Sequence, residues 1–150
     1  MSGTKAIFNQ INVVACDPAA SVAFYRRLGV DIPDDQIWRT ATGIHHVGAS
    51  ASASTTAFDL DSAAFAQMWN AGWRNREDIK GRVVIGFKAA SRRAVDDIYA
   101  DLTGAGYTGL QPPCDAFWGA RFAIIEDPDG IAVGIMSPRS DDKRAPPPEV

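Results

Sequence analysis

Hydrophobic and polar positions follow one another along this chain in short blocks, and the blocks occur twice in the same order. The first half opens on an apolar run, residues 11–15, followed by an amphipathic segment that begins at Asp17-Pro18 and stops at Gly29. Aspartate is a favoured helix N-cap, proline is favoured at the first helical position, and glycine ends helices. The pattern therefore predicts a strand followed by a helix over residues 18–28.

The same block returns 74 residues further on, with Ser91 in the place of Asp17 as the cap. Three apolar residues of each helix coincide: Phe24, Tyr25 and Leu28 in the first, and Ile98, Tyr99 and Leu102 in the second. The second helix is predicted over residues 92–104. Agreement in cap, apolar face and stop indicates an internal duplication. The alternative is an unrelated α+β domain whose two helices are similar by coincidence.

Three candidate strands follow each helix. They are residues 36–41, 44–49 and 55–60 in the first half, and 107–111, 121–126 and 131–136 in the second. The last two flank Asp127-Pro128-Asp129-Gly130, where proline presets φ and glycine accepts a positive φ, as a tight hairpin turn requires. The predicted fold class is α+β, with two βαβββ modules over about residues 6–60 and 82–138. A short helix over residues 62–70 joins them within one domain, residues 1–138.

The composition limits the classes of partner that we expect for this protein. The 150 residues are 46% hydrophobic, which is enough for a sizeable core. The net charge is −3 and the basic residues are scattered, which disfavours nucleic acid as a partner. No apolar run reaches the length of a membrane span, and the N-terminal residues lack the apolar core of a signal peptide, so we expect a cytoplasmic protein without a membrane partner. Residues 139–150 are polar and proline-rich, and are predicted to be a disordered tail.

Three motifs, residues 17–29, 91–99 and 118–130, occur in an order that resembles the vicinal oxygen chelate superfamily. This superfamily includes glyoxalase I, fosfomycin-resistance proteins, extradiol dioxygenases and bleomycin-resistance proteins. The resemblance covers about residues 7–137. It implies that the two modules form curled mixed sheets around a cleft, and that two copies of the chain pair as a homodimer. Because one fold hosts many chemistries, it implies the fold more strongly than the function.

The resemblance also places metal ligands on the first and last strand of each module. Here these four positions are Gln10, Asp59, Val84 and Gly134. Valine and glycine have no donor side chain, and two oxygen ligands fall short of the three or four protein ligands that zinc, iron or manganese sites use. We therefore expect no metal and no other cofactor, with a divalent metal as the less favoured alternative.

Side chains alternate across a strand, so the ligand positions determine which of their neighbours face the cleft. On the four strands that bear them, the cleft-facing residues are predicted to be Gln10, Asn12 and Val14; Thr55, Ala57 and Asp59; Arg82, Val84, Gly86 and Lys88; and Ala132, Gly134 and Met136. Trp118 precedes the seventh strand and is predicted at the mouth of the cleft. From these we choose Gln10, Asn12, Asp59, Arg82 and Trp118 as ligand-binding candidates. In the alternative interpretation Arg82 and Lys88 lie in solvent, or Asp59 forms a structural ion pair with Arg82.

His45 and His46 are adjacent on one predicted strand, so only one of them faces the cleft, and the sequence does not say which. Histidine has an ordinary pKa near neutrality, which makes this residue the first candidate for a general base. Two functions therefore stay open. One is metal-free binding of a small molecule, as in bleomycin-resistance proteins. The other is a glyoxalase-like lyase or isomerase, or a dioxygenase, that uses a divalent metal or the inward histidine; whether the chain is an enzyme is left open.

Overall fold

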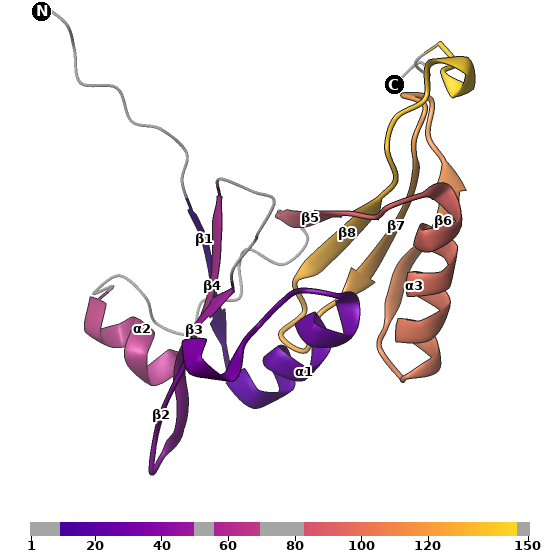
Figure 1. Cartoon of the computed structure of the whole chain (residues 1–150). Helices are drawn as coiled ribbons and strands as arrows, with labels where there is room; N and C mark the ends of the chain where they lie inside the picture. The colour runs from indigo at the N-terminus through magenta and orange to yellow at the C-terminus, as the bar shows by residue number, and fades with distance from the viewer. Residues whose placement is uncertain (1–9, 50–55, 70–82, 147–150) are drawn as a thin grey trace, which may run out of the picture. The chain divides into compact units, whose positions relative to one another are not determined.

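The computed structural model describes residues 10–49, 56–69 and 83–146. They belong to two compact units, residues 1–76 and 77–150, which Figure 1 colours from indigo to magenta and from red to yellow. Each unit contains one four-stranded sheet. None of the helices in the described ranges is long and apolar enough to cross a membrane.

The first unit follows the order β1, α1, β2, β3, β4, α2. Its elements are β1 (Gln10–Ala15), α1 (Pro18–Leu28), a 3-10 turn η1 (Asp34–Gln36), β2 (Ile37–Thr40), β3 (Gly43–Ala49), β4 (Ala57–Ser62) and α2 (Ala63–Trp69). The strands lie in the order β1-β4-β3-β2. β1 and β4 are parallel, and the other pairs are antiparallel.

The second unit repeats this arrangement. Its elements are β5 (Val84–Lys88), α3 (Arg92–Gly104), β6 (Gly109–Asp115), β7 (Arg121–Glu126), β8 (Ala132–Met136) and a 3-10 turn η2 (Asp141–Lys143). The strand order is β5-β8-β7-β6, with β5 and β8 parallel. Both units are therefore βαβββ modules with mixed sheets, and the predicted fold class is confirmed.

Each long helix covers one face of its own sheet. In the first unit Asp17 caps α1 by accepting a hydrogen bond from the Ala20 N–H at 3.0 Å, and Gly29 ends the helix at φ 108°. Tyr25 of α1 is fully buried and its ring lies 4.9 Å from that of Phe58. The core between α1 and the sheet also contains Val13, Phe24, Leu28, Val47 and Leu60. Among them Val13, Phe58 and Leu60 face the helix, as the alternation along the first and fourth strands predicted.

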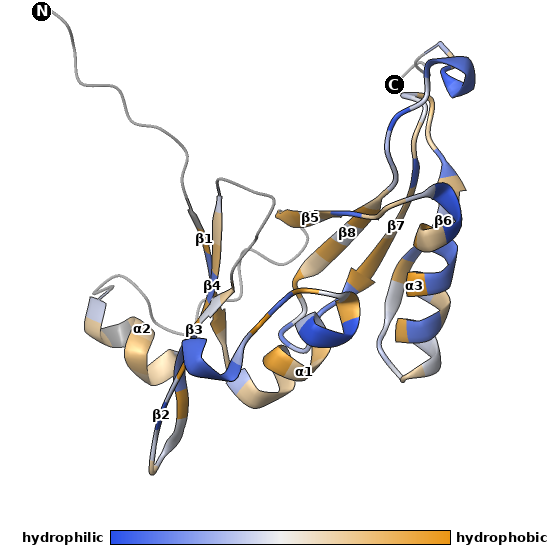
Figure 2. Cartoon of the chain, viewed as in Figure 1, coloured by the Kyte–Doolittle hydropathy of each residue, from blue (hydrophilic) through white to orange (hydrophobic). Residues whose placement is uncertain are grey.

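The second unit has the same construction. Ser91 caps α3 by accepting from the Ala94 N–H at 3.0 Å, and Val95 and Leu102 are fully buried. They belong to a core with Ile85, Ala123, Ile125, Val133 and Ile135. Figure 2 shows this division as apolar colour along β7 and β8 and as alternating polar and apolar residues along α3. Because Ile85, Val133 and Ile135 are in the core, their strand neighbours lie on the opposite face of the sheet.

Two strands differ from the predicted ones. β4 runs two residues past the predicted end, to Ser62, and β6 begins at Gly109 instead of residue 107. β6 also contains Pro112-Pro113, which the sequence analysis placed outside a strand. An edge strand tolerates prolines, and the β6–β7 ladder accommodates them with register shifts on both sides of Gln111.

The sequence analysis placed residues 139–150 in a disordered tail. As far as residue 146, the structure instead shows a segment with backbone hydrogen bonds to the rest of the unit. The Ser140 N–H donates to the Gly119 carbonyl at 2.9 Å, and the Ala145 N–H donates to the Phe117 carbonyl at 2.9 Å. The composition of this segment gave no sign of these backbone hydrogen bonds, which depend on the loop before β7. Residues 147–150 lie outside the described residues.

The turn between β7 and β8 depends on one buried carboxylate. Asp127 is 4% exposed, and its Oδ1 accepts from the N–H groups of Asp129, at 2.8 Å, and Ile131, at 2.9 Å. Gly130 closes the turn at φ 83°. The side chain thus satisfies two backbone donors that the turn itself leaves without partners.

We predict that Asp127→Ala lowers the free energy of unfolding by about 1–3 kcal/mol, because two part-buried backbone donors lose their acceptor. Urea denaturation followed by circular dichroism measures this. Asp97→Ala is the matched control, since Asp97 is exposed on α3 and pairs with Arg93 at 3.6 Å. The control should change stability by less than about 0.5 kcal/mol. Equal losses in the two variants would contradict the assigned role of Asp127.

Candidate functional site

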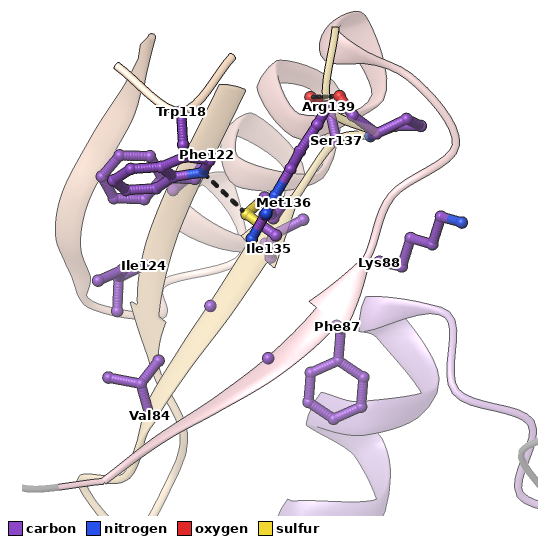
Figure 3. A pocket seen from close by; sticks show the side chains of 14 residues that line it. Val84, Phe87, Lys88, Trp118, Phe122, Ile124, Ile135, Met136, Ser137 and Arg139 are labelled. Carbon is purple, nitrogen blue, oxygen red and sulfur yellow. Dashed lines mark hydrogen bonds between the residues drawn. The ribbon is translucent and has the colours of Figure 1, made fainter. Parts of the chain in front are cut away.

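The second unit has a pocket of about 660 Å³ on the face of the sheet opposite α3. Figure 3 shows its side chains. Strands β5, β7 and β8 and the segments next to them supply Val84, Gly86, Lys88, Trp118, Phe122, Ile124, Gly134, Met136 and Arg139. Val84, Gly86, Lys88, Gly134 and Met136 are residues that the sequence analysis placed on the cleft face. The rule of alternation therefore located the part of this surface that β5 and β8 supply.

Trp118 forms an aromatic wall of the pocket. Its ring lies 5.3 Å from that of Phe122 with an interplanar angle of 31°, and its Nε1 donates to the Met136 sulfur at 3.4 Å. Figure 3 marks this hydrogen bond with a dashed line. The wall is broad and apolar, and is suited to a flat organic group.

The loop that bears Trp118 is held at both ends by ion pairs. Arg121 donates to Asp115 at 3.0 Å and to Asp96 of α3 at 2.8 Å. Arg92 of α3 also donates to Asp115. The hydrogen bond from Arg121, with the charges of Arg92 and Arg121, lowers the pKa of Asp115 below its usual value. These contacts fix the position of the indole relative to the sheet.

Two cationic side chains lie at the β8 end of the pocket. Lys88 is in register with Met136, and Arg139 follows β8 three residues later. Figure 3 shows the Arg139 side chain beside Met136. Both residues are exposed, and neither forms an ion pair with another residue of the described ranges. The pocket therefore combines apolar walls with two positive charges at one end.

The second-unit positions at which the family places metal ligands lie side by side in this pocket. A Cβ on Gly134 would lie 3.1 Å from Cγ1 of Val84. The two residues thus have the neighbouring positions that a shared ion requires, but neither offers a donor atom. The residues present do not fit a metal ion here.

The strand ladders identify the corresponding positions of the first unit. Asn12 pairs with Asp59 in the β1–β4 ladder, and Gly86 pairs with Gly134 in the β5–β8 ladder. Gly86 lies 74 residues after Asn12, so the two ladders correspond. Asp59 is thus the counterpart of Gly134, as the sequence analysis placed it. Asp59 is half-buried, and the side chain of Gln10 lies outside the described residues.

A residue that the sequence analysis missed organises the polar face of the first unit. Asp61 of β4 is 1% exposed and accepts three hydrogen bonds. The donors are Asn12 Nδ2 at 2.9 Å, His46 Nδ1 at 2.5 Å and Trp69 Nε1 at 3.1 Å. Alternation from Asp59 could have indicated Asp61, but the predicted strand stopped one residue short of it. Trp69, at the end of α2, is one of the donors to this carboxylate.

The two histidines have different surroundings. His45 Nε2 lies 2.7 Å from the Thr40 hydroxyl and 2.9 Å from that of Thr42, and its Nδ1 lies 3.1 Å from the Ser62 hydroxyl. His46 bonds Asp61 through Nδ1 and has no partner at Nε2 within the described part of the chain. His46 is therefore the histidine that shares a face with Asn12 and Asp61.

These polar residues line a second pocket, of about 560 Å³, within the first unit. Its walls are Asn12, Trp38, His46, Asp61, Phe65 and Trp69. Asp59 is not among them, and Arg82 lies outside the described residues. Of the five ligand-binding candidates, the structure places Asn12 in the pocket of the first unit and Trp118 in that of the second.

The sequence of the chain matches one family model over residues 7–135, that of the Glyoxalase/Bleomycin resistance protein/Dioxygenase superfamily. The chain belongs to this superfamily. No curated protein sequence matches it. Membership confirms the resemblance noted from the three sequence motifs.

Solved structures of the superfamily share the fold. A glyoxalase-related enzyme from Fulvimarina pelagi is 17% identical, with a TM-score of 0.70 and 88% of each chain covered. The hypothetical protein SA1046 from S. aureus is 22% identical, with a TM-score of 0.68, 91% of this chain covered and 96% of that one. TnmS3, an antibiotic binding protein from Streptomyces sp. CB03234, is 20% identical, with a TM-score of 0.61, 92% of this chain covered and 98% of that one. At these identities the likeness shows the superfamily fold alone.

We predict that Asp61→Asn lowers the free energy of unfolding by about 1–3 kcal/mol, because the new amide N–H₂ replaces an acceptor and faces other donors. Urea denaturation followed by tryptophan fluorescence measures the loss. Asp35→Asn is the control, since Asp35 is exposed on η1 of the same unit. The control should stay within about 0.5 kcal/mol of the parent. An Asp61→Asn protein as stable as the control would contradict the three hydrogen bonds.

Proposed function

We propose that this superfamily member is a metal-free binding protein for a small amphiphilic molecule, held in the pocket of the second unit. One observation supports this most directly. Val84 and Gly134 take the two ligand positions of that unit, and they open an apolar wall where relatives hold an ion. The absence of donor atoms at these positions favours binding over metal-assisted chemistry.

The side chains of the pocket suggest the class of ligand. A flat apolar group would lie against Trp118 and Phe122, since aromatic pairs are worth about 0.5–1.5 kcal/mol beyond the burial of their area. An anionic group would lie toward Arg139 and Lys88, because charge-assisted hydrogen bonds are stronger than neutral ones. An aromatic carboxylate combines these features. Asn12 and Asp59, together with Gln10 and Arg82, stay candidates for further ligand contacts.

The solved relatives are compatible with this function. TnmS3 is described as an antibiotic binding protein, so the superfamily fold includes proteins whose role is to hold a small molecule. Other relatives are described as enzymes, among them the glyoxalase-related enzyme of Fulvimarina pelagi. The choice therefore depends on the residues of this chain, and Val84 and Gly134 favour binding.

A second candidate function is an enzyme of the same fold that works without a metal and uses His46 as its base. The contact between His46 Nδ1 and the buried Asp61 favours it, because a carboxylate partner fixes the orientation of an imidazole. Loss of turnover in His46→Gln, with ligand binding retained, would support this candidate over the binding protein.

The ligand class can be tested with 2-naphthoate and its neutral analogue 2-naphthylmethanol by isothermal titration calorimetry. We predict that 2-naphthoate binds more tightly, that Trp118→Ala weakens both ligands about two- to tenfold, and that Arg139→Ala removes the preference for the anion. Leu110→Ala is the matched control, since Leu110 is exposed in the same unit and does not line the pocket.

Metal content provides the other half of this test. Protein purified without chelator should contain well under one zinc, iron or manganese ion per chain by mass spectrometry of the elements. Stoichiometric metal, or unchanged naphthoate binding in Trp118→Ala, would contradict the proposed function.

We further propose a homodimer, as the superfamily resemblance implied. In the described part of the chain each sheet has two edge strands, β1 and β2 in the first unit and β5 and β6 in the second. Edge strands expose unpaired backbone groups that a second copy can cover. Light scattering should therefore give twice the chain mass of 16.1 kDa. A mass of 16.1 kDa at tens of micromolar protein would contradict this. The cytoplasmic location stays a prediction from the sequence.

A further inference from the structure

The charged side chain of the first-unit pocket has the opposite sign to those of the Trp118 pocket. Its lining residues include the carboxylate of Asp61 and no lysine or arginine. Arg39, on the neighbouring β2, pairs with Asp34 at 3.8 Å and is not part of the lining. The described walls of this pocket therefore contain a negative charge without a permanent positive one.

Two acceptor atoms of the pocket have no hydrogen-bond partner among the described residues. Asp61 already takes the Nδ2 donor of Asn12, the Nε1 donor of Trp69 and the Nδ1 donor of His46. Oδ1 of Asn12 and Nε2 of His46 are the two atoms left without a partner there. In the tautomer whose proton lies on Nδ1, facing the carboxylate, Nε2 of His46 presents a lone pair.

The Asn12 oxygen is an unusual feature of the protein interior. It is the buried side-chain oxygen without a hydrogen-bond partner within the described residues. Its amide cannot be turned round, because Nδ2 is required as the donor to Asp61. A buried acceptor without a donor is costly to the fold, and this oxygen is buried too deeply for a ligand in the pocket to reach it.

Aromatic rings form the rest of the pocket. The rings of Trp38 and Phe65 lie 5.2 Å apart at 79°, and the Phe65 ring lies 5.9 Å from that of His46. Trp38 is 48% and Trp69 is 49% exposed, so both indoles are accessible to a molecule from solvent. Aromatic faces around an anionic site attract organic cations.

We propose that this pocket binds an organic ammonium ion that has at least one N–H. An N–H group donates to His46 Nε2, the positive charge lies near Asp61, and the hydrocarbon body packs against Trp38, Phe65 and Trp69. This site shares no residue with the Trp118 pocket and has the opposite charge preference. It therefore holds whether or not the second unit binds an anion.

Two probes with the same phenylethyl group test the charge preference. They are 2-phenylethylammonium and the neutral 2-phenylethanol, titrated into the full chain by calorimetry with tryptophan fluorescence as a second readout. The ammonium ion should bind at least about fivefold more tightly than the alcohol. Equal binding of ammonium ion and alcohol, or no binding of the ammonium ion, would overturn the proposal.

Two variants locate the site. His46→Leu removes the acceptor at Nε2 and should weaken the ammonium ion about fivefold or more. Phe65→Leu keeps an apolar side chain but removes an aromatic face, and should weaken the ammonium ion more than the alcohol. Phe117→Leu is the matched control for the second variant, because Phe117 is an exposed aromatic residue that lines neither pocket.

The outcome is decisive even if His46→Leu fails to fold, because Phe65→Leu and Phe117→Leu can then be compared alone. Equal ammonium affinity in these two proteins would overturn the proposal. The proposal would also be overturned if neither probe changed the tryptophan fluorescence and only the protein concentration did. That result would show that a second copy of the chain covers Trp38 and Trp69.

Discussion

Packing of one helix on one face of each sheet is the constraint on which the rest of this structure depends. Once Phe58 and Leu60 are buried under α1, Asp59 and Asp61 must lie on the other face of β4. Burial of Ile85, Val133 and Ile135 under α3 likewise directs Val84, Gly134 and Met136 to the opposite face. Both pockets lie on these second faces, so the hydrophobic core determines which side chains are available for function.

The duplicated fold has given its two units very different chemistry. In the second unit the inner face is apolar, with Trp118 and Phe122 as its wall and cations at one end. In the first unit the same face bears a buried carboxylate with three donors. α2 is the structural cause of part of this difference, because it follows β4 directly and brings Phe65 and Trp69 over the polar residues. The second unit has no corresponding helix after β8 in the described residues; a 3-10 turn follows instead.

This arrangement bears on how a metal ion could be held in the described part of the chain. A metal site needs several donor side chains that converge on one point. In the second unit a Cβ on Gly134 would lie 3.1 Å from Cγ1 of Val84, so the two positions are neighbours, but neither residue has a donor side chain. The first unit retains polar side chains, but Asp61 uses its oxygens within the protein. A shared fold is therefore compatible with binding of organic molecules by contacts that involve no ion.

The sequence by itself determined the repeat, both long helices with their caps, the Asp127 turn and the faces of the strands. These features depend on residues close together in the chain, so local propensity and alternation suffice to predict them. The same rule placed Val84, Gly86, Lys88 and Met136 on the functional face. It could not extend β4 to Asp61, because a polar residue at the end of an apolar run gives no local sign of burial.

Tertiary structure alone decided which polar groups meet. Asn12, His46, Asp61 and Trp69 come from β1, β3, β4 and α2, and they converge because the parallel β1–β4 pair and the antiparallel β3–β4 pair share one central strand. The choice between His45 and His46 depended on the same register, since His46 pairs with Asp61 across the sheet. Hydrogen bonds between distant segments depend on which residues of neighbouring strands lie opposite one another. A sequence pattern gives only the order of residues along the chain, so it does not contain that register.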